Sequence, residues 1–589
     1  MKTQGHDRKS DHLLLAACPT EQKGNPGNLF FERDWSLAWA NFLLQEVGSY
    51  ALSSIKNLGP QSLSQRHFVY LPSSLEETPS SQHQAYLKSF LENGGTVVVE
   101  GAGVHSLGFG ELRFGSEKRP LTRITKVGGG AWPSPLVELL LRMPFKTFGW
   151  KIDSCPKEAE VILEMEGAPV LFRQRIGRGE VLALGFDFGL LLVGLQQGIP
   201  VKGEYRLRKL FGTQNRVIEP EDLVLKASLL DNPVPWADLF ERFLFKVITS
   251  GRPAPRWWYF PSGYTGAFIS THDEEAIGLD PRLEAMCETE KSLGVRGNLF
   301  VISDPKLHDR WKDNGALRKW QEGEGPEIGL HWNRFEKPRL KLRRFQFGMH
   351  EEPLEQQKRI LERLVGEPIQ TNRTHYLALG TRYGEHFESL ADHGILFDST
   401  YGPNQGGRGY LFGTAYPYYG LTWQGSLSGV LELPFISQET WGGANLSFLE
   451  RLITESDENF HQCLVTNFHP HYTVLKEAGR ETWLGSLRLA KEKNQWMPTL
   501  GEFFKFFSER NASPFQSRFD GRNLEVSVEA RGKQGALSFP YHTSGGKRLS
   551  RLEVDGVLTA SQKLFNAWSE EVLIPIPQGT HQIRAVYEG

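Results

Sequence analysis

The sequence has few cysteines, no long apolar run and no excess of charge of one sign. Its four cysteines, Cys18, Cys155, Cys287 and Cys463, lie far apart and match neither a disulfide framework nor a zinc-finger spacing. No apolar segment approaches the roughly 20 residues that a membrane-spanning helix needs. These absences predict that the protein lies in a reducing compartment, the cytoplasm, and that it has no membrane-spanning segment.

One segment near the N-terminus is relevant to the cellular location of the protein. The residues Leu15 to Cys18 look like a lipoprotein cleavage box, but the apolar stretch before the cysteine has only about five residues and follows Asp11 and His12. A secretory core needs about 7–15 apolar residues. We therefore interpret His12 to Ala17 as the first buried strand of a folded domain, in agreement with a cytoplasmic location.

The balance of charge excludes one class of partner. The chain has 67 basic and 69 acidic side chains, a net charge of -2, and no basic tract. Binding to nucleic acid needs such basic surface, so we expect no nucleic-acid partner. Aromatic residues make up 12% of the chain, and although such rings can stack on sugars, most are expected in the core.

The length of 589 residues exceeds one ordinary core and predicts about three or four domains. In residues 1–225 a strand at His67 to Leu71, a helix at Ser81 to Asn93 and a strand at Thr96 to Gly101 follow one another. This order predicts a parallel, flavodoxin-like sheet. It resembles the class I glutamine-amidotransferase-like domain, but the turn at Glu100 to Val104 has no cysteine nucleophile, which implies a non-catalytic domain.

The rest of the chain divides into three further segments, so that the whole is expected to be an α/β multidomain protein. Residues 226–255 are a helical linker with one amphipathic helix, Trp236 to Ile248, before a segment rich in Pro and Gly. Residues 256–510 repeat a strand–loop–helix unit and predict a complete or incomplete (β/α) barrel. Residues 511–589 alternate polar and apolar side chains, which predicts a small β-sandwich.

Within residues 256–510, four polar motifs follow the ends of expected strands. The first is the segment Ser270 to Glu275, which closes the apolar run Gly266 to Ile269 with one histidine and three acids. Clustered carboxylates repel one another and are costly to desolvate, so their place at a strand tip indicates function. The other three motifs are Glu327 to His331, Arg373 to Tyr376 and Asn467 to His471.

These residue types suit a metal-dependent hydrolase. A divalent metal needs two or three fixed ligands and an open position for water, and imidazole and carboxylate groups suit zinc and similar ions. The acid cluster and His331 offer such ligands from separate strand ends. A further carboxylate can take a proton from water, and a histidine on the opposite side can protonate the leaving group. The motifs therefore predict hydrolysis of an acyl group.

Taken together, the motifs resemble the polysaccharide deacetylase (NodB-homology) family over roughly residues 260–508. The segment Thr271 to Glu275 is similar to the branch whose first motif reads Thr-His-Asp-x-acid. The resemblance implies that Asp273 is the catalytic base and that Glu275 binds the metal. In the form of the motif with adjacent acids, Glu274 would bind the metal instead, so the choice between the two glutamates stays open.

The second motif departs from the family's usual pattern. That pattern places two metal-binding histidines four residues apart, but the position four after His331 is Phe335. The same branch lacks this histidine and typically reads Glu-Ile-Gly-Leu-His, as residues 327–331 do, followed by Arg-x-His-Tyr, as residues 373–376 do. The resemblance therefore implies that His375 replaces the missing ligand.

Three further roles follow from the resemblance. Arg373 would keep the base ionised, because a nearby guanidinium lowers the pKa of a carboxyl group. The backbone N–H of Tyr376 would bind the oxyanion. His469, in the sequence Phe-His-Pro, stands where the family has its general acid.

The expected function is that of a metal-dependent carbohydrate deacetylase, a hydrolase of carbon–nitrogen bonds other than peptide bonds. Its substrate would be an acetylated sugar or polysaccharide, and Zn²⁺ is the first choice of metal. Two alternatives remain. The absence of a histidine at position 335 suggests a non-catalytic glycan-binding member, and the same residues would serve a hydrolase of another C–N or ester bond. The sugar and the oligomeric state are left open.

Overall fold

A computed structural model describes residues 13–16, 30, 33–63, 66–73, 79–101, 113–130, 132–154, 156–200, 217–224, 232–275, 278, 280–303, 315–336, 350–351, 353–403, 409–438, 446–474, 476–566 and 568–589. The chain forms two compact units. Unit 1 comprises Met1–Gly194, Trp236–Gly263 and Phe506–Gly589, and unit 2 comprises Leu195–Pro235 and Tyr264–Lys505. The four-segment division expected from the sequence stays a prediction.

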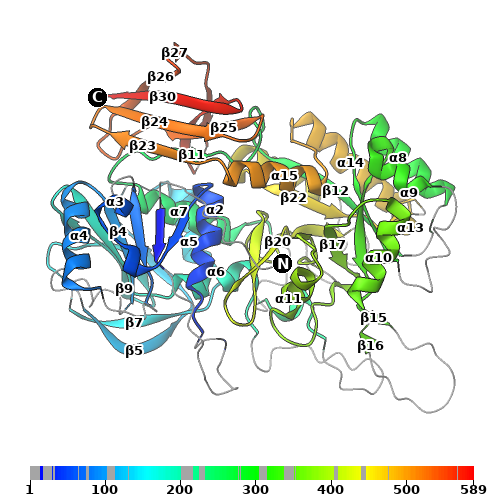
Figure 1. Cartoon of the computed structure of the whole chain (residues 1–589), viewed down its shortest axis with the longest axis horizontal. Coiled ribbons are helices and arrows are strands. Elements are labelled where there is room, and N and C mark those ends of the chain that lie inside the picture. The colour runs from blue at the N-terminus through cyan, green and yellow to red at the C-terminus, as the bar shows by residue number, and fades with distance from the viewer. Residues whose placement is uncertain are drawn as a thin grey trace. The chain divides into compact units, whose positions relative to one another are not determined.

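The N-terminal part of unit 1 is an eight-stranded sheet in the order β2-β1-β3-β4-β10-β9-β8-β6. Its strands β4 and β9 are labelled in Figure 1. Strands β2, β1, β3, β4 and β10 pair in parallel, as the predicted parallel sheet requires. Strands β10, β9, β8 and β6 pair antiparallel, and β9 and β10 form a hairpin. The strands are β1 (Leu13–Ala16), β2 (Ala51–Ser53), β3 (Phe68–Leu71), β4 (Thr96–Glu100), β6 (Ile124–Val127), β8 (Glu160–Met165), β9 (Ala168–Ile176) and β10 (Gly179–Leu184).

The helix expected after the second strand is confirmed as α4 (Ser81–Glu92). Ser80 caps its N-terminus by accepting a hydrogen bond from the His83 backbone, which satisfies a group that the first helical turn leaves unpaired. Leu87, Phe90 and Leu91 are buried on one face. The turn from Ala102 to Val104, and Ala17 and Cys18 of the cleavage-like box, lie outside the described residues.

The C-terminal part of unit 1 consists of two antiparallel sheets, in the orders β11-β25-β29-β28 and β23-β24-β30-β26-β27. Strand β24 (Asn523–Ala530) alternates buried and exposed residues, as the period-two pattern of this segment predicts. The face-to-face contact of a β-sandwich stays a prediction. The remaining strands are β11 (Arg256–Trp257), β23 (Phe515–Phe519), β25 (Gly535–Pro540), β26 (Arg548–Val554), β27 (Val557–Leu558), β28 (Gln562–Phe565), β29 (Glu570–Ile576) and β30 (Gly579–Glu588).

The segment expected to link the first and third domains is part of unit 1. Helix α7 (Trp236–Ile248) has the predicted bounds, and most of its residues are buried, including Asp238 and Glu241. Strand β11, which follows it, pairs with β25 of the C-terminal part. A linker surrounded by solvent exposes most of its side chains, whereas most side chains of α7 are buried. This burial agrees with the assignment of the segment to unit 1.

Unit 2 contains a parallel-rich, curled half-barrel sheet of nine strands in the order β19-β20-β18-β17-β14-β13-β12-β22-β21. Every described neighbouring pair is parallel except β19 with β20. The arrangement agrees with an incomplete barrel. The strands are β12 (Ala267–Glu274), β13 (Asn298–Val301), β14 (Glu327–Trp332), β17 (Thr371–Thr374), β18 (Phe397–Asp398), β19 (Tyr418–Leu421), β20 (Leu427–Glu432), β21 (Phe435–Gln438) and β22 (Cys463–Asn467).

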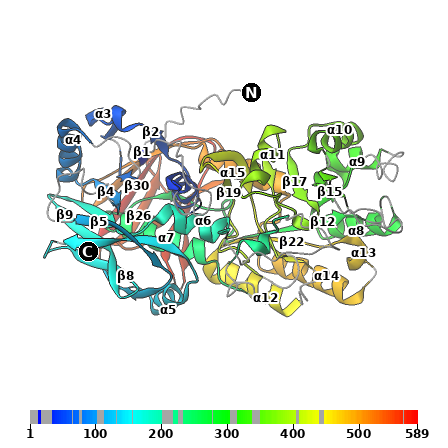
Figure 2. The same cartoon turned by 90° about the horizontal axis from the view of Figure 1, so that it is seen from below.

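Helices lie around the outside of this sheet, as Figure 2 shows for α8, α10, α11, α12 and α14. The helices are α8 (Pro281–Ser292), α10 (Leu354–Val365), α11 (Glu385–Asp392), α12 (Leu446–Glu455) and α14 (Glu477–Glu492). None of the described helices combines the length and apolarity that crossing a bilayer requires.

The strand order explains how distant motifs come together. Strand β12 lies between β13 and β22, and β14 lies between β13 and β17. Because neighbouring parallel strands end at the same edge of a sheet, the four polar motifs share that edge.

Arg510 joins the three segments of unit 1. Its guanidinium is buried and donates to the backbone oxygens of Leu44 (2.6 Å), Gln45 (2.7 Å), Trp257 (3.0 Å) and Trp258 (2.8 Å). These acceptors belong to the N-terminal segment and to the segment after α7. One cation therefore satisfies carbonyl groups from both.

We expect Arg510→Met to lower the free energy of unfolding of unit 1 by at least about 3 kcal/mol, because it leaves several buried carbonyls without a donor. Urea titration followed by circular dichroism measures the change. Arg548→Met, at an exposed position of β26, is the matched control and should change the stability by less than about 0.5 kcal/mol. Equal effects of the two substitutions would contradict this role of Arg510.

Candidate metal centre

Three ligand atoms from three separate segments converge at the carboxyl edge of the unit 2 sheet. They belong to Glu275, just after β12, His331 in β14, and His375, just after β17, and all lie within 4.8 Å of one another. The Glu275 Oε1 atom lies 3.5 Å from Nε2 of His331 and 3.2 Å from Nε2 of His375. One carboxylate and two imidazoles are a donor set that suits zinc.

The other nitrogen of each imidazole is held by a hydrogen bond. Nδ1 of His331 donates to the Arg373 carbonyl oxygen at 2.8 Å, and Nδ1 of His375 donates to Oδ1 of Asn333 at 2.8 Å. A neutral imidazole that donates from Nδ1 has its lone pair on Nε2. Both lone pairs then face the Glu275 carboxylate oxygen, and a cation between these three atoms would relieve their repulsion.

The pKa values favour the forms that bind a metal. Burial lowers the pKa of the His375 imidazole, and His331 beside it lowers it further, although Glu275 opposes this. Burial opposes ionisation of Glu275, but the surrounding histidines His331, His375 and His469 hold the pKa of its carboxyl group far below the usual range. A neutral imidazole and an ionised carboxylate are the ligand forms of these groups.

Asp273, in β12, lies beside this cluster and does not belong to it. Its Oδ1 accepts from the Arg373 guanidinium at 3.1 Å, and its Oδ2 accepts from the Asn467 amide at 2.7 Å. Burial opposes its ionisation, but Arg373, and then His331 and His469, outweigh burial and lower the pKa of the Asp273 carboxyl. Asp273 is therefore an ionised, fixed carboxylate that can accept a proton.

The two neighbouring glutamates point to different partners. Glu275 lies in the cluster, whereas Oε1 of Glu274 accepts the backbone N–H of Gly278 at 2.8 Å. Glu274 is the last residue of β12, and successive side chains of a strand point to opposite faces. This geometry favours Glu275 over Glu274 as a ligand.

His469 and Tyr376 complete the neighbourhood. Nε2 of His469, just after β22, lies 3.6 Å from Glu275 Oε1 and 4.0 Å from Asp273 Oδ2. The Tyr376 ring stacks on the His375 ring with 3.7 Å between their centroids, and its side chain is 42% exposed. Tyr376 (φ 57°) and Leu377 (φ 53°) both have left-handed backbone conformations, which non-glycine residues rarely adopt and which concentrate at functional sites.

All eight residues expected at the site lie in unit 2, and seven of them are linked by these contacts; Glu274 is directed elsewhere. Two residues were not expected, Asn333 and Asn467, which hold His375 and Asp273. Each lies two residues from a motif histidine, and that proximity is the only signal in the sequence. His272 has a structural role, since its ring contacts the Phe468 carbonyl (2.9 Å) and Glu290 (3.0 Å).

Comparison with protein-family models and with curated proteins finds no match. Solved structures show partial similarity. A Mycobacterium smegmatis protein assigned as a polysaccharide deacetylase is 16% identical, with 45% of this chain and 96% of that chain covered and a TM-score of 0.28. An allantoinase, Puue, is 12% identical, with 42% and 91% covered and a TM-score of 0.29.

A third similar structure is a mutant of a CE4-family pseudoenzyme with restored activity. It is 12% identical, with 41% of this chain and 68% of that chain covered and a TM-score of 0.25. All three TM-scores are below 0.5, so these similarities carry no argument about the fold or activity of this chain. The interpretation of the site rests on its own residues.

We expect the full chain to bind one zinc ion, and Glu275→Gln to weaken that binding at least about 100-fold because it removes the charged ligand. Isothermal titration with Zn²⁺ after removal of bound metal measures the affinity. Glu274→Gln is the matched control and should keep the wild-type affinity, since an amide oxygen can still accept the Gly278 N–H. Loss of zinc in Glu274→Gln but not in Glu275→Gln would reverse the assignment.

Proposed function

We propose that the chain is a metal-dependent hydrolase that removes N-acetyl groups from a carbohydrate. The observation that carries this proposal is the convergence of Glu275, His331 and His375 beside Asp273, an ionised carboxylate that is not part of the ligand cluster. Metal ligands and a separate base are what hydrolysis of an amide needs. The order of the motifs, which resembles the polysaccharide deacetylase family, supports the choice of reaction.

Glu275, His331 and His375 would hold the metal. When bound, a divalent metal supplies Lewis acidity, which polarises a carbonyl oxygen and makes water more acidic. The residues that fit it are already oriented, because Asn333 and the Arg373 carbonyl fix the two imidazoles.

The chain's other residues divide the proton transfers between them. Asp273 takes a proton from the water whose oxygen bonds to the acetyl carbonyl carbon, and Arg373 keeps Asp273 ionised for that step. The backbone N–H of Tyr376 donates to the oxyanion. His469 gives a proton to the nitrogen as the C–N bond breaks, and the products are acetate and a free amine.

One aromatic side chain near the site supports a carbohydrate substrate. The exposed Tyr376 ring lies against His375, where it can contact a substrate, and aromatic faces stack on sugar rings. The same catalytic residues would serve another C–N bond or an ester, so the acyl group and the sugar are tested separately below.

A binding protein without catalysis is the second candidate. The observation that favours it is Phe335, which stands four residues after His331 where the family usually has a histidine. A glycan would then bind near Tyr376 without losing an acetyl group. The two candidates differ in whether Asp273 matters for acetate release.

We expect zinc-loaded protein to release acetate from N-acetylated chitooligosaccharides, and Asp273→Asn to lower kcat by about 10²–10⁴-fold because it removes the base. An acetate assay with a parallel zinc titration measures both properties. The substitution should leave zinc binding nearly unchanged, since Asp273 is outside the ligand cluster.

Three controls make this test decisive. Chelation should abolish the release of acetate, and re-addition of zinc should restore it. His469→Gln should lower kcat but keep zinc if His469 is an acid, whereas loss of zinc would make it a ligand. Zinc uptake and sugar binding without release of acetate, from sugars or from acetylated esters and amides, would favour the binding protein.

We expect Arg373→Gln to move the acid limb of the kcat/KM profile to higher pH. Asp273 is active when ionised, and Arg373 lowers the pKa of its carboxyl, so removing the guanidinium raises the pH below which the base is protonated. A pH–rate profile measures the shift. Arg382→Gln, at an exposed arginine of unit 2, should leave the profile in place. An unmoved acid limb in Arg373→Gln would show that Asp273 is not the titrating base.

A further inference from the structure

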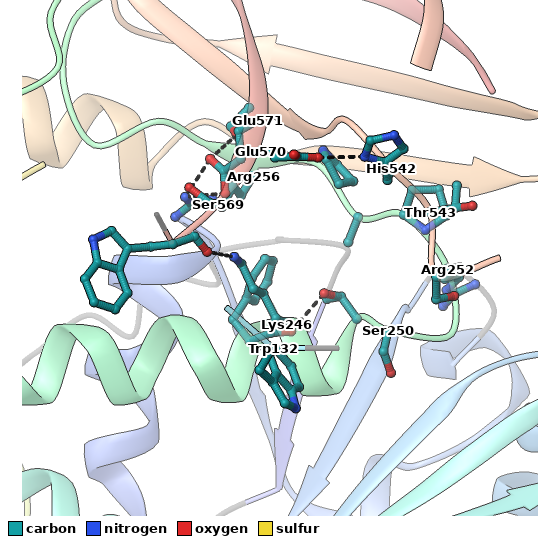
Figure 3. A pocket seen from close by; sticks show the side chains of 18 of the residues that line it. Trp132, Lys246, Ser250, Arg252, Arg256, His542, Thr543, Ser569, Glu570 and Glu571 are labelled. Carbon is teal, nitrogen blue, oxygen red and sulfur yellow. Dashed lines mark hydrogen bonds and ion pairs between the residues drawn. The ribbon is translucent and has the colours of Figure 1, made fainter. Parts of the chain in front are cut away.

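A pocket of about 590 Å³ lies within unit 1 and shares no residue with the candidate metal centre. Three parts of the sequence line it: the loop at Trp132, the end of α7 with the residues after it, and the C-terminal strands around Glu570. Figure 3 shows Trp132, Lys246 and Ser250 on one wall and Glu570, Glu571 and His542 on the facing wall. Its volume is that of pockets for small molecules.

One of the three cations that line the pocket is neutralised by the protein. Arg256 pairs with both carboxylate oxygens of Glu571 at 2.8 Å and with Glu46 at 3.1 Å. On the facing wall, the Glu570 carboxylate contacts Nδ1 of His542 at 2.7 Å. The two carboxylates of the pocket therefore have cationic or hydrogen-bonding partners of their own.

The other two cations, Lys246 and Arg252, have different partners. The Lys246 ammonium donates to the backbone oxygen of Trp568. The Arg252 guanidinium donates to the backbone oxygens of Arg66 (3.3 Å) and His67 (2.9 Å). Within the described part of the chain, neither cation forms an ion pair with a carboxylate, so neutral carbonyls are their partners.

Partial burial makes these two charges costly. Burial lowers the pKa of Lys246 to about 8 and that of Arg252 to about 10, although the charges of Glu571 and Glu180, respectively, oppose the shift. A half-buried cation whose charge is only partly compensated is stabilised further by an anionic ligand. Lys246 and Arg252 come from α7 and from the segment after it, so a ligand held by both would lie along one wall.

The C-terminal end of α7 would otherwise repel an anion, because the last carbonyls of a helix carry partial negative charge. Here these groups have donors. The Phe245 carbonyl oxygen accepts from the Thr249 hydroxyl at 2.8 Å, and the Val247 carbonyl oxygen accepts from Ser250 (2.8 Å) and Arg173 (3.3 Å). The partial negative charge of these helix carbonyl groups is therefore offset by hydrogen-bond donors.

The remaining walls are polar and aromatic. The Trp132 indole is fixed, since its N–H donates to the Gly128 carbonyl at 2.7 Å and its ring lies 4.9 Å from that of Phe243. Trp568, Thr543 and Ser569 add a second indole and two hydroxyl groups. Indoles and hydroxyls suit a polyhydroxylated ligand better than an apolar one.

From these observations we propose that the unit 1 pocket binds an anionic sugar, whose carboxylate or phosphate group contacts Lys246 and Arg252. The proposal is independent of the hydrolase activity proposed for unit 2. It assigns to unit 1 a ligand-binding role in place of a purely structural one.

Isothermal titration of the full chain, stripped of metal with a chelator, tests this. The probes are D-glucuronate, D-glucose 6-phosphate, neutral D-glucose and inorganic phosphate. We expect one of the two anionic sugars to bind at least ten times more tightly than both glucose and inorganic phosphate. The preferred probe distinguishes a carboxylate from a phosphate group.

Two variants locate the binding. Lys246→Gln and Arg252→Gln should each weaken the preferred anionic sugar at least tenfold and leave the weak binding of glucose unchanged. Lys533→Gln, an exposed lysine of unit 1, is the control and should bind as the wild type does. If one pocket variant does not fold, as judged by circular dichroism, the other still tests the same contact.

Several outcomes would overturn the proposal. They are the absence of binding by both anionic sugars, equal binding of glucose and glucuronate, inorganic phosphate binding as tightly as the sugar phosphate, or pocket variants that bind as the wild type does. Inorganic phosphate that binds as tightly as the sugar phosphate would indicate an anion site that does not recognise the sugar.

Discussion

The buried guanidinium of Arg373 is the interaction on which the candidate site depends. It donates to Thr271 (2.6 Å) and Asp273 (3.1 Å) of β12, and to the Ser399 backbone oxygen (2.7 Å) after β18. The carbonyl of the same residue orients His331. A buried cation needs such partners, because an unpaired one would be strongly destabilising. Asp273, the His331 imidazole and three strands are therefore held together by one residue.

This arrangement separates two kinds of carboxylate. Asp273 receives its hydrogen bonds from Arg373 and Asn467, whereas Glu275, two residues later, lies among three histidine nitrogens. Both are ionised, but for different reasons: the first faces a permanent cation and the second faces imidazoles. Such a difference between neighbouring carboxylates is a common basis for dividing the roles of base and ligand.

In unit 1, too, buried cations are compensated by carbonyl groups or by carboxylates. Arg510 satisfies four backbone carbonyls, and Arg256 lies between Glu46 and Glu571, so residues from both ends of the chain meet at two cations. Lys246 and Arg252 differ from Arg256, because both donate hydrogen bonds to backbone carbonyl oxygens and, within the described residues, not to carboxylates. Half-buried cations that donate hydrogen bonds to neutral carbonyls are places where anionic ligands are expected.

The sequence by itself determined the local elements and the residue types of the site. Helical periodicity predicted α4 and α7, alternation predicted β24, and the polar motifs at strand ends predicted which side chains lie at the edge of the sheet.

Tertiary structure decided the rest. The meeting of His375 with Glu275 and the contribution of Asn333 depend on strand order, and the place of Glu274 depends on its hydrogen bond with Gly278. The joining of α7 with both ends of the chain depends on contacts between residues far apart in the sequence, such as Gln45 with Asp238 and Lys246 with Trp568. Local patterns report burial and backbone preference, whereas strand order and long-range ion pairs are set by packing between segments that no local pattern encodes.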